Sequence, residues 1–319
     1  MERVMALVAS LYLIYWSVQA LHAAEPKNLA SLKPFPEHGV YEKDGKKYEC
    51  GLYPGGKNEM PEAHRKAGEK IAATIVPLNS SSKPDANGLI VLGAAGHSNP
   101  REYFGAYKTY IAEEGKKGTL NPKVILMSAC QGGKMCQDWA AQCRTTTPGG
   151  IPKEMQVLFL LTSYHNASRG ATEKKQPEAL KMNFEERTKA MKNNLIVILQ
   201  AFAKGYPQLK LAYVSCDTWR GNSGLEPMVW EEAFAFKDLI ADQLKGDPEL
   251  AYAGPNRKAP WLAWGGYIWE NNPPKDRFAT DGVHPSDAGK AFAYGRWHEV
   301  LSKDSTSRGW FLPSQAAGR

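Results

Sequence analysis

Long apolar runs are nearly absent from this 319-residue sequence, which excludes a protein with several membrane spans. The one marked run, Val4–Val18, lies at the N-terminus, and later apolar stretches are short and bounded by glycine, proline or charged residues. Apolar residues make up 43% of the chain and charged residues 23%. This is the composition of an ordinary globular protein, so disordered and collagenous classes are excluded as well.

Blocks of like charge are also lacking. The 40 Lys and Arg residues outnumber the 33 Asp and Glu residues, and the formal net charge is +7. This excess is spread along the chain, with no zinc-finger, basic-zipper or aromatic RNA-binding signature beside it. We therefore predict that nucleic acid is not a partner.

Cysteine is scarce, with five residues, all of them beyond the N-terminal run. Two disulfides are the most that can form, and sequence does not fix their connectivity. The short spacing from Cys136 to Cys143 favours a local disulfide between them. No C-x-x-C, H-E-x-x-H or paired Cys/His grouping is present, so we predict neither a metal site nor a cofactor.

The N-terminal segment has the pattern of an export signal. Arg3 precedes the apolar run, and small residues follow at Ala20, Ala23 and Ala24. The run is shorter than the roughly 20 apolar residues that span a bilayer. We predict a signal peptide over 1–24, a secreted or periplasmic mature protein without stable membrane insertion, and an irregular extension over 25–60.

Short apolar runs alternate with amphipathic stretches from residue 61 onward, which favours an α/β fold in a single domain over 61–319. The predicted strands are Leu89–Leu92, Val124–Met127, Val157–Leu161, Leu211–Val214 and Trp261–Trp269. Helical stripes are predicted over residues 61–75, 180–205 and 230–244, with a terminal helix through Phe292 and Trp297. This order indicates a three-layer α/β/α sandwich with a five-stranded parallel sheet, in which ligands bind at the carboxyl ends of the strands.

Thr280–Gly289 is the most informative segment for chemistry. Asp281 lies three residues before His284 in a glycine-containing turn, so the carboxylate can bond one ring nitrogen and leave the other as a base. The alternative is that the two residues only shape a loop and cap the following helix.

Three other polar groups follow the ends of separate predicted strands. Ser98 follows the first strand in a turn of small residues, Gly132 follows the second, and Asn166 follows the third. A hydroxyl, a close backbone N–H and an amide are the groups that acyl transfer requires. Each has a simpler alternative, since Ser98 suits a helix N-cap, Gly132 a turn and Asn166 a loop. Their joint placement favours a shared site at one edge of the sheet.

In this order, Ser98, Gly132, Asn166 and the Asp281/His284 pair resemble the SGNH hydrolases, also called the GDSL esterase/lipase superfamily. The similarity runs from about Leu52 to Trp297, and its best match is the closing D-G-x-H-P block. Two blocks depart from the family pattern: Gly96-His97-Ser98 stands where Gly-Asp-Ser is usual, and His165-Asn166 replaces Gly-x-Asn-Asp. Four further segments resemble an exported branch of the family that is common in planctomycete-type bacteria. They are Gly51–Gly56, Gln131–Gly133, Leu225–Pro227 and Trp264–Tyr267.

The resemblance implies a flavodoxin-like sheet and a serine esterase. Ser98 would be the nucleophile, His284 the base and Asp281 its partner, with an oxyanion hole formed by Ser98, Gly132 and Asn166. With the export signal, it implies removal of acetyl or other small acyl groups from a polysaccharide or small ester.

Aromatic residues near the later strand ends are the candidate sugar-binding surface. Trp219, Trp264 and Tyr267, together with His97, are the predicted substrate-binding residues; burial in the core is the alternative. A noncatalytic carbohydrate-binding protein of the same fold is the alternative function. A third interpretation makes Cys130, beside Gly132, a reactive thiol.

Overall fold

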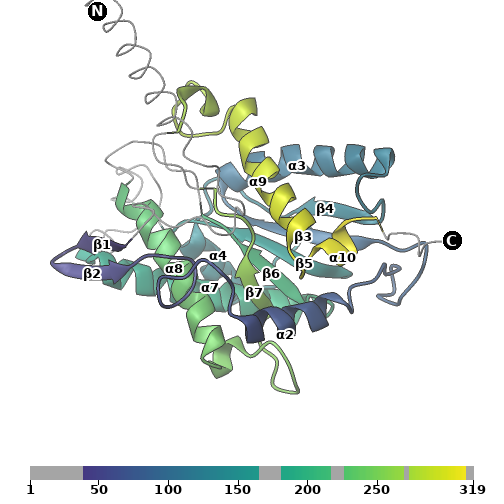
Figure 1. The fold of residues 1–319 in the computed structure, drawn as a ribbon, viewed down its shortest axis with the longest axis horizontal. Helices are drawn as coiled ribbons and strands as arrows, with labels where there is room; N and C mark the ends of the chain where they lie inside the picture. The colour runs from purple at the N-terminus through teal and green to yellow at the C-terminus, as the bar shows by residue number, and fades with distance from the viewer. Residues whose placement is uncertain (1–38, 165–180, 217–225, 269–272, 314–319) are drawn as a thin grey trace, which may run out of the picture.

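The computed structural model describes residues 39–164, 181–216, 226–268 and 273–313 (Figure 1). The predicted export signal lies outside these ranges. Within them, no helix combines the length and the apolar character needed to cross a bilayer.

The centre of the fold is the predicted five-stranded parallel sheet. Its strands are β3 (Ile90–Gly96), β4 (Val124–Ser128), β5 (Met155–Leu161), β6 (Leu211–Val214) and β7 (Trp261–Trp264). They lie in the order β4-β3-β5-β6-β7, and every neighbouring pair is parallel. This is the flavodoxin-like 2-1-3-4-5 order, in which the order of adding strands switches from one side of β3 to the other, between β3 and β5. In sheets of this order, ligands bind outside the carboxyl ends of the strands where the order switches.

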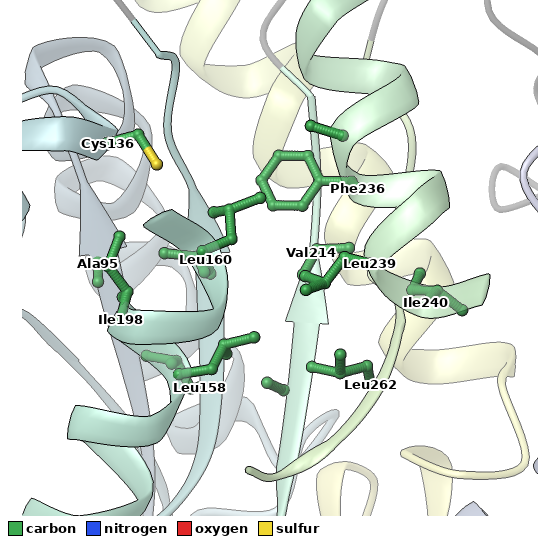
Figure 2. Close-up of a cluster of buried hydrophobic side chains, with 14 of the residues drawn as sticks. Ala95, Cys136, Leu158, Leu160, Ile198, Val214, Phe236, Leu239, Ile240 and Leu262 are labelled. Atoms are coloured by element: carbon green, nitrogen blue, oxygen red, sulfur yellow. The ribbon is translucent and has the colours of Figure 1, made fainter. Parts of the chain in front are cut away.

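The sheet is buried on both faces because its side chains alternate between two apolar layers. All seven residues of β3 and of β5 are buried. Leu158 and Leu160 of β5 contribute to one layer, where Figure 2 shows them with Ile198 and Phe236. Phe159, between them, belongs to the opposite layer. The uninterrupted apolar runs in the sequence therefore reflect a sheet covered on both sides.

Helices cover both faces, as the alternation of patterns predicts. On one face lie α4 (Cys136–Cys143), α7 (Phe184–Gly205) and α8 (Glu226–Leu244). On the other lie α3 (Ser98–Lys117), α9 (Asp287–Lys303) and the short α10 (Arg308–Phe311), with α2 (Glu62–Ala72) packed near its edge (Figure 1). Single turns of 3-10 helix occupy Pro248–Leu250 and Lys275–Arg277.

The N-terminal extension is more ordered than predicted. Strands β1 (Val40–Lys43) and β2 (Lys46–Glu49) form an antiparallel hairpin. Asp44 and Gly45 make its turn with φ of 52° and 72°, a conformation that Asp-Gly adopts readily. Tyr41 stacks on Trp230 of α8 with ring centroids 3.9 Å apart, and this contact anchors the hairpin. The expectation of irregular structure over 25–60 is wrong for this part.

The local disulfide predicted between Cys136 and Cys143 is also wrong. The two residues are the first and last of α4, and both are free thiols. Cys143 is seven residues after Cys136, and seven helical rises place their Cα atoms about 10 Å apart along the axis. A disulfide requires Cα atoms within about 7 Å, so the helix itself keeps the two sulfurs apart.

Gly96 at the end of β3 offers a test of this packing. A Cβ there would lie 2.0 Å from the Leu161 carbonyl oxygen and 2.7 Å from the Pro100 ring, so Gly96→Ala should lower the free energy of unfolding by about 1–3 kcal/mol. Gly105→Ala is the matched control, since an added Cβ meets nothing within 4 Å and α3 should gain about 0.5–1 kcal/mol. Urea denaturation measures both; equal stability of the two variants would contradict the close contact.

Candidate active site

Ser98 lies where β3 leaves the sheet and α3 begins. It is the first residue of α3, is partly exposed, and follows the buried N-cap His97. His97 makes no side-chain cap bond to the first turn. Pro100 has no N–H, so the backbone donors that open this helix are those of Ser98 and Asn99. The N-terminus of a helix favours negative charge, which suits an oxyanion formed at Ser98.

The Gly96 carbonyl ties the loop after β4 to this helix start. It accepts hydrogen bonds from the Gln131 backbone N–H at 2.9 Å and from the Trp139 indole N–H at 3.2 Å. The next residue after Gln131 is Gly132, and a Cβ there would come within 3.0 Å of the Arg101 guanidinium. Arg101 belongs to the first turn of α3. Gly132 therefore lies beside the turn that carries Ser98.

Asp281 and His284 form the predicted pair. The Asp281 Oδ2 atom lies 2.7 Å from His284 Nδ1, while Oδ1 accepts the backbone N–H groups of Val283 and His284 at 2.8 and 2.9 Å. Gly282 has a φ of +64°, which lets the chain turn tightly between the two residues. The loop closes where Ala279 N–H donates to the His284 carbonyl at 2.8 Å. Both side chains remain about half exposed, at 50% and 42%.

The hydrogen bonds at Asp281 also set its charge. Donation from His284 and from the two backbone N–H groups holds the pKa of the Asp281 carboxyl well below its usual range. The carboxylate is therefore ionised at any pH near neutrality. With Nδ1–H donated to that carboxylate, Nε2 is the ring nitrogen of His284 that accepts a proton.

A buried amide connects the loop of Asp281 and His284 to the helix of Ser98. Asn99 is 2% exposed, and its Nδ2 donates to the Val283 carbonyl at 3.3 Å. Farther along, Phe104 of α3 stacks on Trp297 of α9 with centroids 4.6 Å apart. Helix α9 starts at Asp287, directly after the loop. Helix packing and the Asn99 amide thus hold Ser98 and His284 at the same end of α3.

Within the described ranges, no hydrogen bond joins the Ser98 hydroxyl to the His284 ring. Catalytic hydrogen bonds are often long before substrate binds and shorten in the complex. Asn166 and Trp219 lie outside the described residues, so their roles stay predictions. The segment that leads to Asn166 begins with Thr162 and Ser163, both fully buried at the end of β5.

The aromatic residues predicted to bind substrate are packed inside the protein. Trp264 is 2% exposed and donates its indole N–H to the Leu52 carbonyl at 2.8 Å; Tyr267 is fully buried. His97 is also buried. Trp264 closes β7, and both rings lie in the apolar layer under α8. The expectation that Trp264, Tyr267 and His97 face a substrate is therefore corrected, because burial leaves them no open surface.

Three residues of this region were not predicted from sequence. Asn99 joins the start of α3 to the loop of Asp281 and His284, Arg101 lies against Gly132, and the Trp139 indole donates to the Gly96 carbonyl. Asn99 and Arg101 are close to Ser98 in sequence, and Arg101 is three residues on, which on a helix means the same face. Trp139 has no such sequence signal, since its partner is 43 residues away.

Two open grooves lie elsewhere on the molecule. One of about 510 Å³ lies between β2 and helices α7 and α8, and another of about 830 Å³ lies between residues 54–64 and the end of α8. Neither is lined by Ser98, Gly132, Asp281 or His284. They are therefore separate from the candidate active site.

Comparison with known proteins gives limited information. No protein-family model matches the chain, and no curated protein matches it significantly. Among solved structures, the lipase Lip_vut3 from a goat rumen metagenome is 15% identical, with a TM-score of 0.43 over 66% of this chain and 96% of its own. A protein named TesA is 12% identical, with a TM-score of 0.36 over 67% of this chain and 99% of its own. At these values neither likeness bears on activity, and the fold class rests on the sheet itself.

Cys130 provides a test of the rival thiol interpretation. Desolvation raises the pKa of the Cys130 thiol to about 12, and the thiolate is the reactive form. At pH 8 the folded protein should therefore alkylate at Cys130 with iodoacetamide far more slowly than the urea-denatured chain, as followed by peptide mass spectrometry. Equal rates in the two states, or protection of Cys130 by an ester, would support a reactive thiol.

Proposed function

We propose that this protein is an exported serine esterase of the SGNH hydrolase type that removes acetyl or other small acyl groups, with a polysaccharide as the substrate class. The observation that carries the proposal is the Asp281–His284 hydrogen bond, in a loop bonded through Asn99 to the helix start that holds Ser98. An ionised carboxylate, an imidazole and the hydroxyl of a partly exposed serine at one helix end are the groups needed for acyl transfer.

The proposed reaction has two halves. The Ser98 Oγ attacks the ester carbonyl carbon while His284 Nε2 takes the hydroxyl proton, and the C=O electron pair moves onto oxygen. The intermediate then collapses, and the alcohol leaves with the proton from Nε2, so that Ser98 carries the acyl group. Water attacks this acyl-enzyme with the same assistance, which releases the acid and restores Ser98. Throughout, Asp281 orients the ring and stabilises its cation.

The oxyanion would be stabilised by backbone donors. The N–H of Ser98 lies at the N-terminus of α3, and that of Gly132 lies beside the same turn because Gln131 is bonded to Gly96. Asn166 would add an amide. One such donor typically contributes about 3 kcal/mol to the transition state.

The substrate class is proposed from the sequence. Export would place the enzyme among extracellular glycans, and together with the resemblance to the SGNH hydrolases it favours acyl groups on a polysaccharide. A binding surface made of Trp264 and Tyr267 is not part of the proposal, since both are buried. The noncatalytic alternative rests on the departures at Gly96-His97-Ser98 and His165-Asn166, which this burial does not test.

Substitution of the proposed catalytic residues tests the function. Fluorophosphonate labelling should be lost in Ser98→Ala, and turnover of 4-nitrophenyl acetate should fall by about 10⁴-fold or more in Ser98→Ala and His284→Ala. Asp281→Asn should cost about 10²–10⁴-fold. Ser81→Ala, at an exposed loop serine, is the matched control and should keep wild-type labelling and turnover.

Labelling that persists in Ser98→Ala would refute the assignment of the nucleophile. Binding to a glycan array without turnover, unchanged by Ser98→Ala, would establish the noncatalytic alternative instead.

The pH profile tests the base. Only a neutral imidazole can take the serine proton, so a histidine base predicts that kcat/KM falls on the acid side. Asp281 should not contribute to this limb, because its hydrogen bonds hold its pKa far lower. Stopped assays from about pH 5 to 9 measure the profile. A flat profile over this range would contradict a histidine base.

A further inference from the structure

A guanidinium group covers the turn that is proposed to bind the oxyanion. Arg101 follows Ser98 by three residues on α3, and Cβ atoms at that spacing are about 5–6 Å apart. Its Nη1 and Cζ atoms lie 3.0 and 3.6 Å from the position that a Cβ on Gly132 would take. The Arg101 side chain is 54% exposed, so its charge is open to solvent at this place.

A second cation, Lys134, belongs to the same turn. Lys134 donates its Nζ to the Gln131 Oε1 atom at 3.3 Å and stands 4.6 Å from the Trp139 ring centroid. The Trp139 indole is the group bonded to the Gly96 carbonyl. The turn from Gln131 to Lys134 thus carries one positive charge of its own and has a second, from Arg101, beside Gly132.

Arg101 forms an ion pair with Glu102, but the nearby carboxylates leave most of the guanidinium donors available. Glu102 lies 3.2 Å from Arg101 Nη2 and occupies one of the five guanidinium N–H donors. Asp138 accepts the Met135 backbone N–H at 3.0 Å, and Asp281 is bonded to His284. Arg101 therefore retains donors for an anion.

Resting on the proposed esterase activity, we propose that Arg101, with support from Lys134, selects esters that carry a carboxylate close to the scissile bond. A guanidinium can bind a carboxylate through two parallel hydrogen bonds, which fixes orientation as well as charge. The carboxylate can belong to the alcohol, as in an acetylated uronic acid, or to the acyl group, as in a half-ester of a dicarboxylic acid. Arg101 is in either case a residue of substrate specificity rather than of bond cleavage.

Two matched pairs of esters test the proposal. Acetylated methyl glucuronide and acetylated methyl glucoside differ by a carboxylate on the sugar, while phenyl hydrogen succinate and phenyl butyrate differ by one on the acyl group. The wild-type protein should have a higher kcat/KM for the charged ester than for the neutral ester of one pair. Preference within the sugar pair would place the carboxylate on the alcohol, and preference within the phenyl ester pair would place it on the acyl group. Arg101→Gln should lower kcat/KM for that charged ester about fivefold or more, mainly through KM, with the neutral ester changed less than about twofold.

Further variants separate charge from structure. Arg101→Lys should keep part of the preference, and added salt should weaken it, because both readouts depend on charge. Arg65→Gln on α2, which removes an arginine paired with Glu69 instead, should leave the preference unchanged. Equal kcat/KM on both members of both pairs, or an equal loss on charged and neutral esters in Arg101→Gln, would overturn the proposal while the esterase function stands. Absence of both labelling at Ser98 and turnover of neutral esters would instead refute the esterase itself.

Discussion

The carbonyl group of Gly96 is the constraint on which the candidate site depends. It ends strand β3 and accepts hydrogen bonds from Gln131 and Trp139, so the loop after β4 is held against the start of α3. The same residue has no space for a side chain, because the Leu161 carbonyl and the Pro100 ring fill the position. One glycine thus allows β3, β5 and α3 to approach closely while its carbonyl fixes the neighbouring loop.

A second set of contacts brings the last loop of the domain to the same place. The pair of Asp281 and His284 is formed locally, within four residues, by an aspartate that also accepts two backbone N–H groups. Its position at the Ser98 end of α3 comes from elsewhere, through the Asn99 amide and the stacking of α9 on α3. Local bonds therefore orient the imidazole, and long-range packing decides what it can reach.

Much of the fold follows from the sequence pattern, and so does the composition of the site. Continuous apolar runs such as β5 indicate a strand buried on both faces, and alternation with helical stripes indicates a parallel sheet. The hairpin at Asp44-Gly45 was missed although its turn dipeptide is a good signal, because its strands are short and polar. The α4 helix that separates Cys136 from Cys143 was missed too, since eight residues with little periodicity carry a weak signal.

The sequence by itself determined the residue types, their order after the strand ends, and the short-range Asp281–His284 spacing, because these depend on neighbours in the chain. Only the tertiary structure decided that Trp264 and Tyr267 are buried, that Asn99 bridges to Val283, and that Arg101 lies over Gly132. Each of these is set by segments far apart in sequence, whose distance depends on how the helices pack on the sheet. Periodicity in one segment carries no information about the side chain that another segment will bring against it.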